Sequence, residues 1–196
     1  GVVVQNYKLH PEARIDEQLE DVTSAVSWTL KNMSSYGAGG RVYLMGHSAG
    51  GHLISLLGLD GRYFTVAGIN PDSISGYIAL SPLLDIADMV ASNDAKFNDD
   101  ISYPIFGRDE LVWRDYSPAT YFRRDMPPYL LMVGDDDFGY IGHQVSRAVS
   151  QFEELGAKVD HAVISGTTHA RMVVGFGADE DLISRVVDFI NRGSGQ

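Results

Sequence analysis

A serine flanked by glycines is the feature of this sequence best suited to chemistry. Residues 46–50, Gly-His-Ser-Ala-Gly, have the G-x-S-x-G spacing of a nucleophile elbow, a sharp strand-to-helix turn that presents a serine hydroxyl. The apolar residues 42–45 predict a buried strand before it, and residues 52–59 predict an apolar helix after it. The free N–H groups at the start of such a helix stabilise an oxyanion. We therefore predict Ser48 as a nucleophile and the Ala49 N–H as one oxyanion donor.

A serine nucleophile needs a general base, and the sequence offers six histidines. In the architecture built around this turn, the chain order is serine, acid and histidine. His169 follows residues 158–164, which are predicted as the last strand, and is our candidate for the base. His47 lies inside the motif and is expected to line the substrate pocket instead. The remaining four are expected to be structural or on the surface: His10, His52, His143 and His161.

The carboxylate that orients the histidine is predicted after an earlier strand. Three aspartates, residues 135–137, follow Gly134 at the end of the apolar run 129–133. Carboxyl ends of parallel strands meet at one edge of a sheet, so this position lies beside Ser48. The residues alone leave the choice among the three open. Asp85, which follows the predicted strand 76–80, is an alternative acid.

Apolar runs and helical periodicities alternate along the chain. They predict strands at residues 2–7, 41–46, 76–80, 129–133 and 158–164, and helices at residues 16–35, 49–59, 86–91, 140–155 and 179–191. Such alternation predicts an α/β fold with a parallel sheet covered on both faces. We see neither a repeat nor a linker, which favours a single domain over residues 1–196.

Two segments show no clear periodicity. Residues 60–74 are predicted as a loop because they contain two glycines, an asparagine and a proline. Residues 92–127 are predicted to be irregular, and their many aromatic side chains argue against disorder. We expect this segment to form a cap-like insertion over an apolar cleft. Phe138 and Met172 are expected to contribute to the same substrate pocket.

Composition narrows the possible ligands. The chain has 196 residues and a formal net charge of −11, which disfavours nucleic acid as a partner. It contains no cysteine, so disulfides and thiolate metal sites are excluded. No apolar run approaches the ~18 residues of a membrane span. We expect a small molecule as ligand, with no metal and no cofactor.

Beyond the motif, the chain resembles the α/β-hydrolase carboxylesterases of the esterase/lipase group, including feruloyl-esterase-like, arylformamidase-like and isoprenylcysteine-methylesterase-like members. The resemblance is carried by residues 6–12, 19–22, 41–53, 116–119, 127–131 and 155–158. In the family, the acid stands third after a glycine that closes its strand, which matches Asp137. The family histidine matches His169.

The resemblance implies hydrolysis of neutral carboxylic esters through an acyl-enzyme formed on Ser48. Hydrolysis of an aryl formamide is an alternative within the same group. A non-catalytic ligand-binding module on a hydrolase scaffold is an alternative of another class, because fold does not fix function.

One family feature has no counterpart in this chain. The family carries a His-Gly-Gly loop before the strand that matches residues 2–7, and its backbone supplies further oxyanion donors. The strand before that loop lies between the strands that match residues 2–7 and 41–46, so the N-terminal strands of the fold are missing here. Residues 2–7 are largely apolar, which predicts a strand buried on both faces. We therefore expect an upstream segment, a second chain or a homo-oligomer to complete the sheet.

Overall fold

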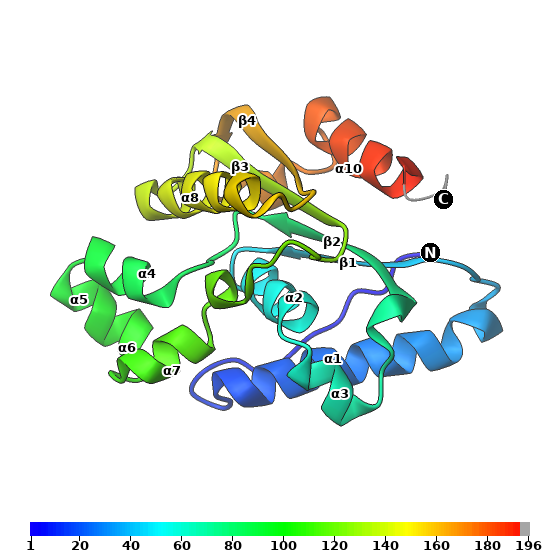
Figure 1. The fold of residues 1–196 in the computed structure, drawn as a ribbon, viewed down its shortest axis with the longest axis horizontal. Coiled ribbons are helices and arrows are strands. Elements are labelled where there is room, and N and C mark those ends of the chain that lie inside the picture. The colour runs from blue at the N-terminus through cyan, green and yellow to red at the C-terminus, as the bar shows by residue number, and fades with distance from the viewer. Residues whose placement is uncertain (193–196) are drawn as a thin grey trace.

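The computed structural model describes residues 1–192 and contains a parallel sheet of four strands in the order β1-β2-β3-β4 (Figure 1). The strands are β1 (Val42–His47), β2 (Ile74–Leu80), β3 (Tyr129–Asp136) and β4 (Asp160–Thr168). All three neighbouring pairs are parallel, so the four carboxyl ends lie along one edge. The predicted α/β class is therefore confirmed.

Helices connect the strands and cover the sheet. They are α1 (Ile15–Asn32), α2 (Ala49–Leu59), α3 (Arg62–Ala67), α4 (Ile86–Ser92), α5 (Ala95–Phe97), α6 (Tyr103–Phe106), α7 (Glu110–Asp115), α8 (Gly139–Leu155), α9 (Arg171–Val174) and α10 (Glu180–Arg192). The five predicted helices are confirmed to within a few residues, and α2 has the predicted bounds. No helix within residues 1–192 is long and apolar enough to cross a membrane.

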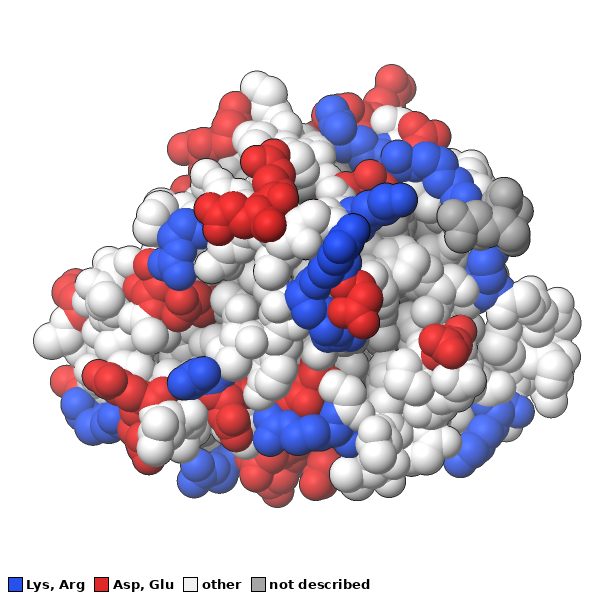
Figure 2. Space-filling model, in the orientation of Figure 1, with Lys and Arg blue, Asp and Glu red and all other residues white. Residues whose placement is uncertain are grey.

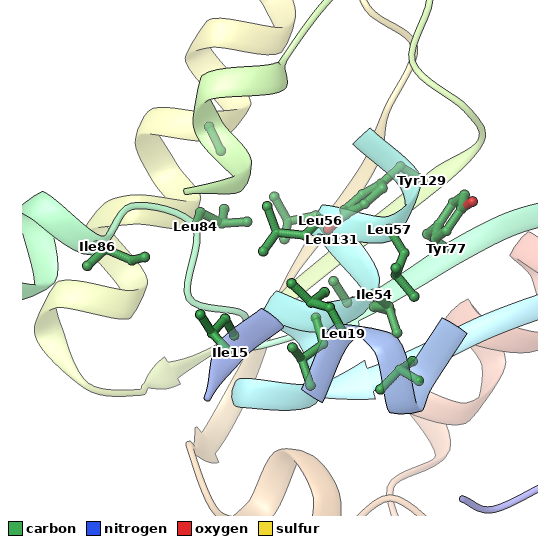
Figure 3. Packing of buried hydrophobic residues seen from close by; sticks show 14 of the residues in the cluster. Ile15, Leu19, Ile54, Leu56, Leu57, Tyr77, Leu84, Ile86, Tyr129 and Leu131 are labelled. Atoms are coloured by element: carbon green, nitrogen blue, oxygen red, sulfur yellow. The ribbon is translucent and has the colours of Figure 1, made fainter. Parts of the chain in front are cut away.

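Alternating side chains of the central strands supply two hydrophobic clusters, one on each face. Tyr129 and Leu131 of β3 join a cluster with α1, α2 and α8, which Figure 3 shows in part. Leu130 and Met132 of the same strand join the second cluster, with α9 and α10. β2 and β3 are thus buried on both sides, as expected for the centre of a parallel sheet.

The prediction of a buried strand over residues 2–7 is wrong. These residues form no strand, and Val2 and Val4 are 89% and 88% exposed. A strand needs a neighbour for its N–H and C=O groups, and within residues 1–192 no strand pairs with this segment or with the outer edge of β1. The structure therefore has four of the five predicted strands.

Two segments predicted to lack regular structure contain short helices. Residues 60–74 contain α3, a helix of six residues that ends at Gly68 in a left-handed conformation. The aromatic-rich segment 92–127 contains α5, α6 and α7, together with a π-helical turn at Asn98–Ser102 and a 3-10 turn at Pro118–Tyr121. Helices of three to six residues are too short for an apolar periodicity to appear in the sequence. The segment is therefore ordered and helical rather than irregular.

Candidate active site

Ser48 occupies a strained turn between β1 and α2. Its backbone has φ 53° and ψ −117°, a combination that is costly for a residue with a side chain. The Ser48 N–H donates to the Leu80 carbonyl at 2.9 Å, which holds the turn against the end of β2. A side chain at Gly46 would meet the Gly50 backbone at 2.4 Å, so the crossing of strand and helix requires glycine there. The turn leaves the Ser48 side chain at the carboxyl edge of the sheet.

A close approach of β3 and β4 brings the predicted acid and base together. A Cβ atom at Gly134 would lie 1.9 Å from the Thr167 carbonyl oxygen, so only glycine allows this crossing. The register of the two strands shifts between Gly134 and Asp136, where the pairing is irregular. Asp137 follows the last residue of β3, and His169 follows the last residue of β4.

One chain of hydrogen bonds links Ser48, His169 and Asp137. His169 Nε2 lies 2.9 Å from Ser48 Oγ, and His169 Nδ1 lies 2.7 Å from Asp137 Oδ1. An ionised carboxylate only accepts hydrogen bonds, so Nδ1 carries the proton and Nε2 accepts from the serine hydroxyl. The Asp137 side chain is 1% exposed and that of His169 is 16% exposed. The serine–histidine end of the chain is thus the end nearer to solvent.

Asp137 is held in its charged form. Burial acts to raise the pKa of Asp137, but hydrogen bonds from His169 and Ser81 and the charge of His169 outweigh burial and hold that pKa below its usual range. The Phe138 N–H adds a further hydrogen bond at 2.7 Å. A charged Asp137 fixes the ring orientation of His169 and stabilises its protonated form.

The other candidate acids bind elsewhere. Asp135 accepts hydrogen bonds from the Ser165 hydroxyl at 3.0 Å and from the Thr167 N–H at 3.2 Å. Asp136 is exposed at the end of β3. Asp85 caps α4 through the Asp88 N–H and forms an ion pair with Arg147. Of these aspartates, only Asp137 is hydrogen-bonded to His169.

Two of the three predicted pocket residues contact His169. The His47 ring donates from Nε2 to the His169 carbonyl at 2.8 Å, and burial, followed by the charge of His169, lowers the pKa of His47. The Phe138 ring lies 4.6 Å from the His169 ring and is 54% exposed. The assignment of Met172 to the pocket is wrong, because α9 buries it fully in the second hydrophobic cluster.

Sequence reasoning missed Ser81, which directly follows β2. Its hydroxyl donates to Asp137 Oδ2 at 2.5 Å. The only signal in the sequence is its position at the end of an apolar strand, which Asp137 and His169 share. The four strand ends therefore carry Ser48, Ser81, Asp137 and His169.

The oxyanion donor predicted at Ala49 is the first residue of α2. The N–H groups of the first turn have no carbonyl partner within their own helix, and the helix dipole makes this end positive.

Within residues 1–192 no group of three or more metal-ligating side chains is arranged to hold an ion. Acidic and basic side chains are interspersed over the face shown in Figure 2.

Known proteins resemble this chain in sequence over most of its length. A family model described as BD-FAE matches residues 1–151. Esterase LipC of Mycobacterium tuberculosis is 30% identical over 175 residues, which cover 84% of this chain and 43% of that protein. A probable isoprenylcysteine alpha-carbonyl methylesterase of Arabidopsis thaliana is 25% identical over 182 residues, which cover 84% of this chain and 37% of that protein. The chain thus spans less than half the length of these relatives.

Solved structures show the same fold. A truncated form of a carbohydrate esterase from gut microbiota has a TM-score of 0.78 and 21% identity, covering 97% of this chain and 73% of that one. Esterase B from Lactobacillus rhamnosis has a TM-score of 0.72 and 17% identity, covering 96% of this chain and 64% of that one. The family match over more than half of its residues shows that this chain belongs to the BD-FAE family and shares the α/β-hydrolase fold of the carboxylesterases.

Proposed function

We propose that this chain carries the catalytic centre of a serine esterase that hydrolyses neutral carboxylic esters. The observation that carries the proposal is the continuous hydrogen-bond chain from Ser48 Oγ through His169 to Asp137, at 2.9 and 2.7 Å. These distances lie within the reach needed between a nucleophile, its base and the group that orients the base. Membership of the BD-FAE family and the esterase relatives support the same reaction class.

In the proposed mechanism, Ser48 Oγ attacks the ester carbonyl carbon while His169 Nε2 takes the hydroxyl proton. His169 then gives this proton to the departing alkoxide, which leaves as an alcohol. The acyl group stays bound to Ser48 Oγ. A water molecule then attacks the acyl carbonyl carbon while His169 Nε2 takes its proton. His169 returns this proton to Ser48 Oγ, and the carboxylic acid is released. Throughout, the charged Asp137 keeps the His169 Nδ1 proton in place and stabilises the imidazolium.

The Ala49 N–H is the proposed donor to the oxyanion that forms in each attack. It heads an apolar helix of eleven residues, so the positive end of the dipole faces the developing charge. Acyl transfer of this kind uses at least two such donors in related folds. We propose that a further polypeptide segment beside β1 brings the second donor and covers the free edge of that strand.

The proposed substrate is uncharged and contacts Phe138 on its way to Ser48. The half-exposed Phe138 ring lies against His169 and offers an apolar surface next to the reacting atoms. The net charge of −11 disfavours anionic substrates. Short-chain and aryl esters meet both conditions.

Ser48→Ala tests the nucleophile. We expect it to lower kcat by about 10⁴-fold or more, because the covalent step is lost. Ser146→Ala, an exposed serine on α8, is the matched control and should leave kcat unchanged. A fluorophosphonate should label Ser48 in the wild-type protein. Labelling of another serine, or turnover retained in Ser48→Ala, would overturn the proposal.

A panel of p-nitrophenyl esters of rising acyl length, beside an aryl formamide, tests the substrate class. We expect the short esters to be cleaved faster than the formamide and the rates to depend on acyl length. Faster cleavage of the formamide would assign amide hydrolysis instead. Binding of an apolar ester without turnover in the assembled protein would favour a ligand-binding module.

A further inference from the structure

We propose that Ser81 is a positioning residue that fixes the carboxylate of Asp137 for its work on His169. The inference rests on the proposed function, because Asp137 matters for catalysis only if His169 acts as a base. Ser81 lies at the end of β2, between the strand that leads to Ser48 and the strand that leads to Asp137. It is fully buried, so no substrate reaches it.

The two oxygens of the Asp137 carboxylate have different partners. Oδ1 accepts from His169 Nδ1 and from the Phe138 N–H, both at 2.7 Å. Oδ2 accepts from the Ser81 hydroxyl at 2.5 Å. Both side chains are shielded from bulk water, so solvent cannot replace this hydrogen bond freely. Without Ser81, Oδ2 would lose a strong donor inside the protein, where an unpaired charged oxygen is costly.

The backbone of Ser81 points to selection for its hydroxyl. Ser81 has φ 48°, and only one other non-glycine residue within residues 1–192, Ser48, has a positive φ. A glycine adopts this conformation at lower cost, so a conformational requirement alone would favour glycine. The Ser81 N–H donates to the Met132 carbonyl at 2.7 Å, which anchors the residue to β3 ahead of Asp137. The turn therefore places the Ser81 hydroxyl, which a glycine would lack, within hydrogen-bond distance of Asp137 Oδ2.

This arrangement restricts rotation of the carboxylate. Hydrogen bonds to both oxygens define the plane of the Asp137 carboxylate, and that plane sets the direction from which His169 Nδ1 binds. If the hydroxyl is removed, we expect the carboxylate to rotate and the His169 ring to lose its fixed orientation. The loss of orientation should slow the chemical step, which kcat measures, and should leave substrate binding unchanged.

Ser81→Ala and Ser81→Gly together test the proposal. Both remove the hydroxyl, but glycine also relieves the positive φ. We expect kcat to fall by about 10- to 100-fold in both variants, as for loss of one hydrogen bond to a charged group, with KM nearly unchanged. Ser165→Ala is the matched control, because it removes a serine hydroxyl from the neighbouring carboxylate of Asp135. Its kcat should equal that of the wild type.

A proton NMR measurement separates this inference from the proposed function. The His169 Nδ1–H, bonded to Asp137, should give a downfield resonance that is absent in a His169→Ala variant. We expect Ser81→Ala and Ser81→Gly to shift or broaden it, and Ser165→Ala to leave it unchanged. Wild-type kcat retained in Ser81→Gly, or an unaltered resonance in both Ser81 variants, would overturn the positioning role. A wild-type protein without esterase activity but with the expected shifts would refute the proposed function alone.

Discussion

The direction of one aspartate side chain decides whether His169 has a carboxylate partner. Three aspartates follow each other at the end of β3. Side chains alternate along a regular strand, which would place Asp135 and Asp137 on the same side, but the pairing with β4 is irregular between Gly134 and Asp136 and the strand ends at Asp136. Asp135 turns to Ser165 and Thr167 of β4, whereas Asp137 turns to His169 and Ser81. The residues alone left this choice open, and only the spacing after Gly134 in the resembled family indicated Asp137.

Asp137→Asn should lower kcat by about 10⁴-fold, because an asparagine can donate to Nδ1 and so favour the wrong tautomer of His169. Asp135→Asn is the matched control, since it removes the same charge two residues earlier without touching the histidine. The measurement is kcat for a p-nitrophenyl ester at neutral pH. A large loss in Asp135→Asn or Asp85→Asn, with Asp137→Asn active, would contradict the assignment.

Phe138 allows a test of the proposed substrate surface. Phe138→Ala removes an exposed ring that stacks on Tyr140 and contacts His169. We expect KM for aryl esters to rise by up to about 10-fold, the value of one aromatic contact, with a smaller effect on alkyl esters. Leu111→Ala on α7 is the control, because Leu111 is 74% exposed and lies in another helix. An equal rise in KM for all esters would argue against aromatic recognition.

At the scale of elements, the sequence predicted best where one signal covered a whole helix or strand. The helix 49–59 was predicted with its observed bounds because the glycine-rich turn marks its start and an apolar run fills it. Helix α3 was missed because its six residues bury only Phe64, which leaves no periodic pattern. Met172 was misplaced because a short helix, α9, turns it into the core. Ser81 was missed because a positive φ at a serine has no sequence signature.

His52 connects α2 to the segment 92–127. Its Nε2–H donates to the Tyr116 carbonyl at 2.7 Å, and burial lowers the pKa of His52 to about 4. Between that value and its ordinary 6.5, the unfolded chain binds a proton that the folded protein does not. The free energy of unfolding therefore falls as pH drops through this window. The neutral His52 ring makes its full contribution to that free energy only above the window.

We expect His52 to account for a loss of about 2 kcal/mol in unfolding free energy between pH 7 and pH 5. His52→Gln retains an amide donor for the Tyr116 carbonyl but cannot titrate, so its loss over this range should be smaller by that amount. Urea unfolding at both pH values measures the difference. The exposed His161→Gln variant controls for the change of residue type. Equal pH dependence in His52→Gln and the wild type would contradict the prediction.

At the scale of the whole molecule, the sheet is covered unevenly. Its centre is buried on both faces, but β1 has an edge that no strand within residues 1–192 pairs with, and Met45 of β1 is 43% exposed. The segment predicted as a buried strand is exposed instead, and Gln5 within it has a buried Oε1 that accepts no hydrogen bond within residues 1–192. Apolar residues and a free strand edge of this kind favour association with another polypeptide.

We therefore expect the 196-residue chain alone to self-associate, and a protein that includes the proposed segment beside β1 to remain monomeric. The double change Val2→Lys and Val4→Lys should reduce the self-association, because charge on this exposed apolar segment opposes its burial against a second copy. Val66→Lys is the matched control: Val66 is 90% exposed but lies on α3, outside the sheet. Size-exclusion chromatography with light scattering measures the mass. A wild-type chain that elutes as a stable monomer of 21.4 kDa with full esterase activity would show that neither the edge nor the oxyanion site needs a further segment.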